Sequence, residues 1–129
     1  MTTPLLEFTI EPRFSETDAL GHINNVAITA WLEFGRTRLI QHLANVTEAL
    51  APKSWVVVSV LIEFAAETFY GDDVTLKITG VSFGNTSMTV DCELWQKGRL
   101  TVRGKSVLVY RDPQTGDKKS IPDALKQAI

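Results

Sequence analysis

The chain has 129 residues, 44% of them hydrophobic and 22% charged, with a formal net charge of −2 at pH 7. This length suits a single domain spanning residues 1–129, large enough to bury a core without staples. No basic excess is present to neutralise phosphates, which argues against nucleic-acid binding. The chain has one cysteine, Cys92, so it has no disulfide framework. Its two histidines, His22 and His42, lack metal-ligand spacing. We therefore expect no metal and no cofactor.

The N-terminal stretch MTTPLLEFTIEPR has neither a basic region nor a long apolar core, so it does not predict a signal peptide. No apolar run approaches the ~18 residues that a membrane-spanning helix needs. These features favour a cytoplasmic location without a membrane partner.

Two elements are expected in the first third of the chain. Residues 5–12 alternate apolar and polar side chains, which predicts a short strand. From about Asn24 to Ala44 apolar residues recur at helical spacing, which predicts one long helix. Its first half is apolar almost all round and is expected to be surrounded by protein. Its second half, with Arg36, Arg38 and His42, is expected to emerge into solvent.

Four further strands are expected after Pro52. The segment 55–64, WVVVSVLIEF, is a near-continuous apolar run rich in β-branched residues, as in a central strand. Alternating segments follow at 74–79, 88–95 and 100–106, separated by turn residues at 71–73, 84–85 and 97–98. The short turns predict that these strands form an antiparallel meander. A short terminal helix is expected within 121–129.

This order of elements, a strand, a long helix and four antiparallel strands, indicates the α+β class. A single sheet must cover its apolar face, and the long helix is the only available cover. We therefore predict a five-stranded antiparallel sheet curled around one central helix.

The stretch 13–36, RFSETDALGHINNVAITAWLEFGR, holds the candidate chemistry. Asn24 and Asn25 open the helix, and asparagine is a good N-cap because its side-chain oxygen accepts free N–H groups of the first turn. A helix N-terminus also attracts developing negative charge. The carboxylate of Asp18 and the imidazole of His22 lie a few residues before it. This combination suits an enzyme that attacks a carbonyl and must hold an oxyanion.

The pattern resembles the hotdog-fold acyl-CoA thioesterases, in particular the 4-hydroxybenzoyl-CoA thioesterase-like group. The resemblance is carried by Arg13-Phe14, Glu16-Thr17-Asp18, Gly21-His22, Asn24-Asn25, Trp31-Leu32-Glu33 and Arg36, and by Ile62-Glu63-Phe64 and Tyr70-Gly71-Asp72 further on. It covers nearly the whole chain and implies a single hotdog domain, in which the sheet wraps around the helix.

The resemblance assigns roles to particular residues. The family's catalytic carboxylate falls on Asp18, and its carbonyl-polarising backbone amide falls on Asn25. Related acyl carrier protein thioesterases use Asp-x-Asn-x-His before two asparagines, which matches Asp18, His22, Asn24 and Asn25 but puts Leu20 at the first asparagine. The alternative for Asp18 is a loop carboxylate in an Asx-turn. The alternative for His22 is a structural histidine that pins the loop.

Three positions depart from the family's pattern. Asn25 stands where some members have histidine, Ile28 where tyrosine is common, and Glu67 where proline is common. Glu63 and Glu67 end an apolar strand, so we expect them to be solvated or to blunt a sheet edge. The alternative is that they approach the site from a second subunit.

Candidate substrate-binding residues are Asn24, Trp31 and Phe64. The two aromatic residues could line an acyl channel, with ordinary core packing as the alternative reading. Glu33 and Arg36 stand three apart on the helix, a spacing that favours a salt bridge.

We therefore expect a thioester hydrolase that converts an acyl-CoA, or an acyl carrier protein thioester, to free acid and thiol. Asp18 acts as nucleophile or general base, and the helix N-terminus at Asn25 holds the oxyanion. The resemblance implies a homodimer with the site between subunits, and sometimes a dimer of dimers. One alternative is a hotdog hydratase or dehydratase, whose Gly-Asp-x-Asn-Pro-x-His motif ETDALGH does not match. Another is a non-catalytic acyl-CoA-binding hotdog module.

Overall fold

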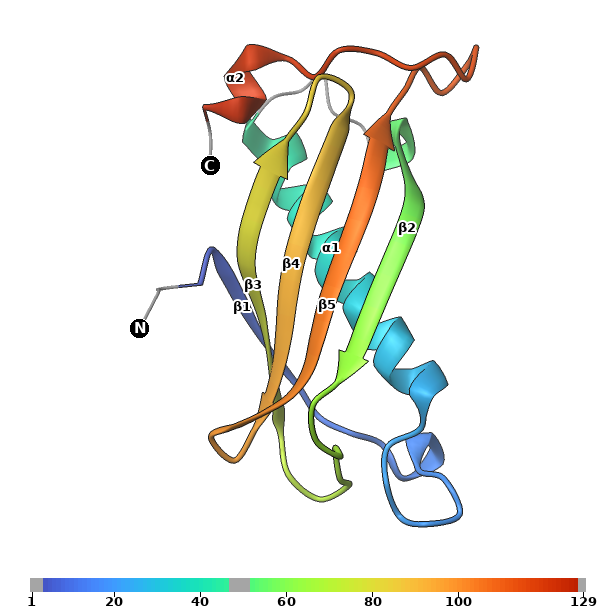
Figure 1. Ribbon diagram of the computed structural model, residues 1–129, viewed down its shortest axis with the longest axis vertical. Coiled ribbons are helices and arrows are strands. Elements are labelled where there is room, and N and C mark those ends of the chain that lie inside the picture. Colours follow the sequence, from blue (N-terminus) through green and yellow to red (C-terminus); the bar gives the residue numbers. More distant parts are fainter. Residues whose placement is uncertain (1–3, 47–51, 128–129) are drawn as a thin grey trace.

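The computed structural model describes residues 4–46 and 52–127. One long helix, α1 (Asn25–Val46), lies against a single curved layer of strands (Figure 1). The strands are β1 (Leu6–Ile10), β2 (Trp55–Phe64), β3 (Val74–Phe83), β4 (Ser87–Gln96) and β5 (Arg99–Tyr110). Shorter helices occupy Phe14–Glu16, Pro52–Ser54 and, as α2, Asp123–Lys126. No helix in the described ranges has the length and hydropathy needed to cross a membrane.

The five strands form one antiparallel sheet in the order β1-β3-β4-β5-β2. The prediction of a five-stranded antiparallel sheet with one long helix is therefore confirmed. The expected turn between β4 and β5 has positive φ angles at Lys97 (53°) and Gly98 (71°), as a tight hairpin requires. The meander is shorter than predicted, because only β3, β4 and β5 are neighbours in chain order.

β2 lies at an edge of the sheet and not at its centre, so that part of the sequence prediction is wrong. It pairs with β5, from Trp55 opposite Tyr110 to Phe64 opposite Val102. Apolar residues on both faces usually indicate a strand that is covered on both sides. Here several of them are exposed instead: Val57, Val58, Val60, Leu61 and Phe64. The described part of the chain does not supply the cover that this apolar run implies.

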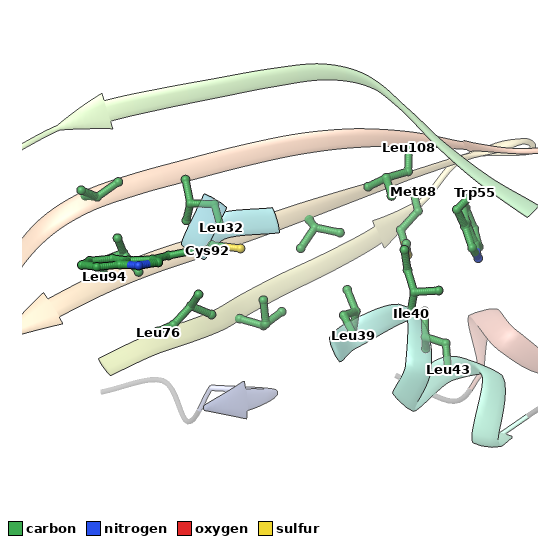
Figure 2. Packing of buried hydrophobic residues seen from close by; sticks show 14 of the residues in the cluster. Leu32, Leu39, Ile40, Leu43, Trp55, Leu76, Met88, Cys92, Leu94 and Leu108 are labelled. Carbon is green, nitrogen blue, oxygen red and sulfur yellow. The ribbon is translucent and has the colours of Figure 1, made fainter. Parts of the chain in front are cut away.

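The core lies between α1 and the inner face of β3, β4 and β5 (Figure 2). Two glycines hold the helix close to the strands. A Cβ on Gly35 would stand 2.8 Å from Cδ2 of Leu76, and one on Gly104 would stand 3.1 Å from Cδ1 of Leu32. The missing side chains therefore allow a close approach of helix and sheet. Fully buried side chains include Leu32, Leu39, Leu43, Leu76, Ile78, Met88, Leu94 and Leu108.

Three expectations about α1 are wrong, the second of them for Arg36 alone, since Arg38 and His42 are exposed as expected. Its first half is not surrounded by protein, since Val26 is 79% exposed; a helix on one sheet is covered on one side only. Arg36, expected in solvent, is buried, and its Nη1 donates to Oγ of Ser106 on β5 at 3.2 Å. Because the guanidinium turns toward the sheet, no ion pair joins it to Glu33 among the described residues.

Candidate active site

The N-terminus of α1 is capped as the sequence predicts. Oδ1 of Asn24 accepts the backbone N–H of Ala27 at 2.8 Å, and the carbonyl of Asn24 accepts the N–H of Ile28 at 3.2 Å. Asn24 is therefore the N-cap and Asn25 the first helical residue. The backbone N–H of Asn25 belongs to the first turn, whose donors have no intrahelical partner. No hydrogen bond from it is found within residues 4–46 and 52–127, so it can bind a ligand.

Asp18 lies in a tight loop before this helix. Its Oδ1 accepts the backbone N–H of Leu20 at 2.8 Å and that of His22 at 3.1 Å. Gly21 adopts a φ of +82°, which allows the chain to turn back on the carboxylate. Asp18 therefore forms the Asx-turn that sequence analysis named as the alternative to a catalytic role. The turn occupies only one oxygen, and among the described residues no hydrogen bond is found to Oδ2.

Glu16 links the same loop to α1 through hydrogen bonds. Its Oε1 accepts the backbone N–H of Arg13 at 2.7 Å, and its Oε2 accepts the indole N–H of Trp31 at 2.9 Å. The carbonyl of Glu16 accepts the backbone N–H of Asn24 at 2.8 Å. Both carboxylate oxygens of Glu16 are thus used in holding the loop to α1, which gives this residue a structural role.

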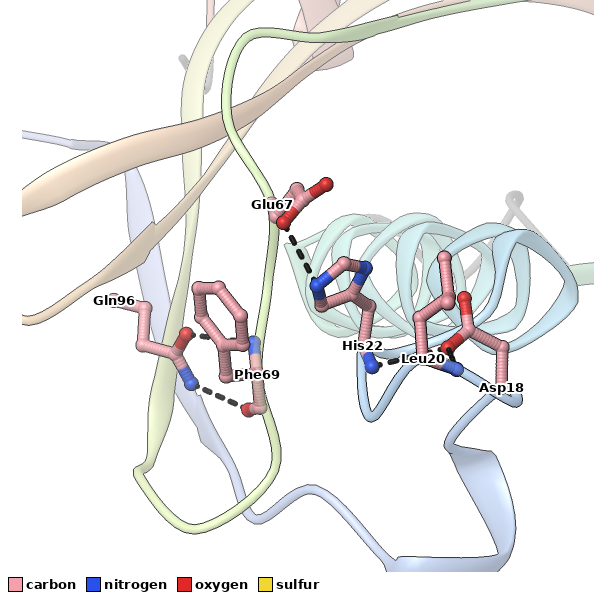
Figure 3. Close-up of polar contacts among 6 residues, drawn as sticks. All are labelled: Asp18, Leu20, His22, Glu67, Phe69 and Gln96. Carbon is pink, nitrogen blue, oxygen red and sulfur yellow. Dashed lines mark hydrogen bonds and ion pairs between the residues drawn. The ribbon is translucent and has the colours of Figure 1, made fainter.

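The connection between β2 and β3 closes the site from the opposite side (Figure 3). The sequence suggested an approach of Glu67 to the site only as an alternative and from a second subunit, whereas here it comes from the same chain. Oε2 of Glu67 lies 2.8 Å from Nε2 of His22, so the two form an ion pair when the imidazole is protonated and a hydrogen bond when it is neutral. The ring of Phe69 lies edge-on to the imidazole, with 5.1 Å between centroids. The only signal in the sequence was Glu67 itself, at a position where the resembling family favours proline.

A cavity of about 330 Å³ opens where these elements meet. It is lined by Asp18, His22, Ile23, Asn25, Ile28, Phe64, Ala66, Glu67 and Thr68. The structure therefore brings together four of the predicted site residues, Asp18, His22, Asn25 and Phe64.

Two predicted substrate-binding residues do not line this cavity. Asn24 is engaged in capping the helix. Trp31 is only 6% exposed and lines a separate cavity of about 430 Å³ near β1, together with Phe34. The structure thus separates Trp31 from the Asp18 cavity.

The arrangement combines three chemical functions in one cavity. Asp18 offers a carboxylate oxygen without a hydrogen-bond partner in the described structure. His22 offers an imidazole oriented by Glu67, and the start of α1 offers free N–H donors with the positive end of the helix dipole. A carboxylate, an imidazole and an anion-binding helix end are suited to acyl transfer. The single cysteine plays no part, because Cys92 is buried in the core.

Comparison with known proteins identifies the class. The model of the thioesterase-like superfamily matches residues 12–129, and the chain therefore belongs to that superfamily. No curated protein matches the chain. The resemblance inferred from sequence is confirmed: the protein is a thioester hydrolase with a single sheet and central helix of the hotdog type.

Solved structures agree with this assignment. A predicted thioesterase from Bacillus stearothermophilus is 34% identical, with a TM-score of 0.82 over 95% of this chain and 91% of that one. A thioesterase superfamily member from Jannaschia sp. CCS1 is 28% identical, with a TM-score of 0.82 over 95% of this chain and 79% of that one. A thioesterase from Thermus thermophilus, complexed with coenzyme A and zinc, is 23% identical, with a TM-score of 0.84 over 97% of both chains. At that identity the last likeness shows the fold alone.

Proposed function

We propose that the protein hydrolyses acyl-CoA thioesters, RCO–SCoA + H₂O giving RCOOH + CoASH. The observation that supports this most directly is the cavity of about 330 Å³ in which Asp18, His22 and the start of α1 meet. The coenzyme A bound by the similar Thermus thermophilus thioesterase is consistent with this substrate class.

In this proposal the thioester carbonyl oxygen binds at the backbone N–H of Asn25. Asp18 either attacks the carbonyl carbon, giving an anhydride that water opens, or removes a proton from an attacking water. In both routes the carbonyl oxygen gains negative charge, which the helix N-terminus stabilises. The C–S bond then breaks, and the departing thiolate takes up the proton that Asp18 removed from water or, in the direct-attack route, a proton from the water that opens the anhydride. Incorporation of ¹⁸O from labelled water into the Asp18 carboxylate would identify the direct-attack route.

His22 is proposed to contact the reacting thioester or the attacking water through Nδ1. Its Nε2 faces Glu67, so Nδ1 is the atom that stays available. Phe64 forms an apolar wall and is proposed to contact the acyl group. Asn24 caps α1, and Trp31 lines the separate cavity near β1. Neither lines the Asp18 cavity, and a direct contact of either residue with substrate stays a prediction.

We propose further that two copies pair through β2 and complete the cavity. Phe64 lines the cavity and is 51% exposed on the edge strand β2. The same strand also exposes the apolar side chains of Val58 and Leu61. Antiparallel pairing of two β2 strands would satisfy the unpaired edge and cover its apolar side chains. It would also bring the partner's β2 next to Phe64. A dimer of dimers is the alternative outcome of a mass measurement.

The test is a free-thiol assay on a panel of acyl-CoAs with short, long and aromatic acyl groups, together with one acyl carrier protein thioester. Release of thiol at the rate of acid formation supports hydrolysis. Tight binding of acyl-CoA without thiol release would instead support the non-catalytic module. Addition or loss of water from an enoyl-CoA would support a hydratase or dehydratase.

A further inference from the structure

The segment between β2 and β3 carries two side chains that contact the imidazole of His22. Glu67 contacts Nε2 of the imidazole at 2.8 Å, and the ring of Phe69 packs against it at an interplanar angle of 80° (Figure 3). The backbone is tied as well, since Ile23 N–H donates to the carbonyl of Thr68 at 2.8 Å. The position of His22 therefore depends on the position of this segment.

Gln96, the last residue of β4, holds that segment in place. Its side chain is nearly buried, with 6% of the residue exposed. Oε1 accepts the backbone N–H of Phe69 at 2.9 Å, while Nε2 donates to the carbonyls of Phe69 at 2.8 Å and Asp72 at 3.0 Å. The amide thus uses its oxygen and both of its hydrogens on one irregular segment.

The two ends of this segment are anchored differently. Near β2, the backbone N–H groups of Ala65 and Ala66 both donate to the carbonyl of Thr101, at 2.9 and 3.1 Å. At the far end, the side chain of Gln96 supplies the hydrogen bonds from β4 to Phe69 and Asp72. Two other contacts reach this end, a backbone bridge between His22 and Phe69 and an exposed ion pair of Lys97 with Asp72 at 3.1 Å. Removing the Gln96 amide would therefore loosen this end, without freeing it, and would leave the Thr101 anchor intact.

We infer that Gln96 is a positioning residue for His22 and acts through the segment that carries Glu67 and Phe69. The inference rests on the proposed function, in which His22 faces the thioester. Glu67 bonds Nε2 and so fixes which nitrogen carries the proton, leaving Nδ1 as an acceptor turned away from Glu67 (Figure 3). Gln96 does not line the cavity, so its effect on chemistry must pass through the segment, and the inference assigns that effect to the contact of Glu67 with His22.

The main experiment is a double-mutant cycle between Gln96→Leu and His22→Ala, with kcat and KM measured on the best acyl-CoA of the panel. Gln96→Leu keeps a similar volume and removes all three hydrogen bonds. We expect kcat to fall roughly 10- to 100-fold with little change in KM, as for a small misplacement of a reacting group. In the His22→Ala background, Gln96→Leu should cause almost no further loss.

Thr101→Val is the matched control. Thr101 is also buried on the neighbouring strand, and its hydroxyl donates one hydrogen bond to the carbonyl of Leu94 at 3.2 Å. Valine keeps the shape and the backbone anchor, so stability should fall while kcat stays unchanged. If Thr101→Val lowers kcat as much as Gln96→Leu does, general loosening explains the effect and the inference is wrong.

A measurement on the wild-type protein tests the first step of the inference, that Glu67 sets the tautomer of His22, and the same measurement on a Gln96 variant tests the second. The chain has two histidines, and the exposed His42 serves as the reference in ¹⁵N NMR. Neutral His22 should be the Nε2–H tautomer, and this preference should weaken in Gln96→Leu. Should that variant not fold, Gln96→Glu is used, because it keeps an acceptor for Phe69 N–H and loses both donors.

The outcomes separate the two proposals. If the wild type hydrolyses no thioester, the proposed function fails, whatever the tautomer of His22. If the wild type is active but the losses from Gln96→Leu and His22→Ala simply add, the positioning role is wrong. A neutral His22 that carries its proton on Nδ1 would overturn it as well.

Discussion

Oδ1 of Asp18 accepts the backbone N–H of His22 at 3.1 Å, so the carboxylate and the imidazole of the cavity are locked into one short loop. The carbonyl of His22 in turn accepts the backbone N–H of Asp18 at 2.7 Å. One carboxylate oxygen therefore builds the loop and the other is left for chemistry. A substitution that removes the charge of Asp18 but keeps an oxygen therefore separates the two roles, because the hydrogen bonds of the loop need an acceptor oxygen and not a charge.

Asp18→Asn should abolish most turnover without unfolding the loop. The asparagine oxygen still accepts the N–H groups of Leu20 and His22, whereas the nucleophile or base is lost. We expect kcat to fall by at least ~10²–10⁴, with acyl-CoA binding no weaker, because an anion near the substrate is removed. Steady-state kinetics and isothermal calorimetry measure the two effects.

Glu16→Gln is the control for this prediction. Glutamine keeps one acceptor for Arg13 or Trp31 but not the pair of acceptor oxygens that Glu16 uses, so thermal stability should fall and kcat should stay within a few-fold. If Asp18→Asn keeps half of the wild-type kcat while Glu16→Gln is inactive, the catalytic carboxylate has been misassigned.

The features that sequence predicted are local ones. The cap at Asn24, the start of α1 and the span of β2 each depend on residues within a few positions, which propensity and periodicity report directly. The features that it missed depend on how distant segments pair. The contact of Glu67 with His22 requires knowing that the β2–β3 connection passes over the helix N-terminus, which no local pattern encodes.

The apolar run of β2 shows the same limit in another form. Its composition predicts burial, yet Val57, Val58, Val60, Leu61 and Phe64 are exposed in the single chain. Sheet order places β2 beside β5 at an edge, so the residues that suggested a central strand are exposed in one chain. A cover supplied by a second copy would reconcile the pattern with the structure.

The protein should therefore be a dimer, and Val60→Lys should weaken it. Val60 is 42% exposed on β2, and a charge there would be buried in a β2–β2 interface. Light scattering should give about twice 14.3 kDa for the wild type and a lower mass for the variant. Leu5→Lys is the control: Leu5 is 44% exposed beside β1, at the opposite edge of the sheet, and its substitution should leave the mass unchanged. A wild-type monomer at micromolar concentration would contradict the prediction.

The buried thiol of Cys92 should make stability depend on alkaline pH. Burial raises the pKa of this thiol from 9.0 to about 12, although the nearby charge of Arg36 acts in the opposite direction. Between about pH 9 and pH 12 the unfolded chain therefore releases the Cys92 proton while the folded chain keeps it. The free energy of unfolding should fall as pH rises through this window, and less steeply in Cys92→Ala. Urea titrations at several pH values measure the slope; identical slopes for both proteins would contradict the assignment.

The cap at Asn24 should contribute measurably to stability. Asn24→Ala removes the acceptor of the Ala27 N–H and should lower the free energy of unfolding by about 1 kcal/mol, whereas Asn24→Ser should lower it less. Asn25→Ala is a close comparison, because the Asn25 side chain is exposed and no hydrogen bond to it is found among the described residues. Equal losses in urea unfolding from Asn24→Ala and Asn25→Ala would show that the cap bond contributes nothing.

The oxyanion donor is predicted to be the backbone N–H of Asn25 and not its side chain. Asn25→Ala keeps this N–H, so kcat should change little. Asn25→Pro removes it, yet proline is well tolerated at the first helical position, where the donor has no intrahelical partner. The preceding residue must then be extended, which suits the N-cap Asn24.

Asn25→Pro should therefore fold but lose roughly 10²–10³ in kcat, the magnitude expected for one oxyanion donor. Circular dichroism and the mass from light scattering must first match those of the wild type, so that loss of activity reports the missing N–H and not a damaged helix. Stopped-flow measurement of one turnover then isolates the chemical step from product release. A folded and active proline variant, or an alanine variant that is equally inactive, would place the oxyanion at the Asn25 side chain or at another donor.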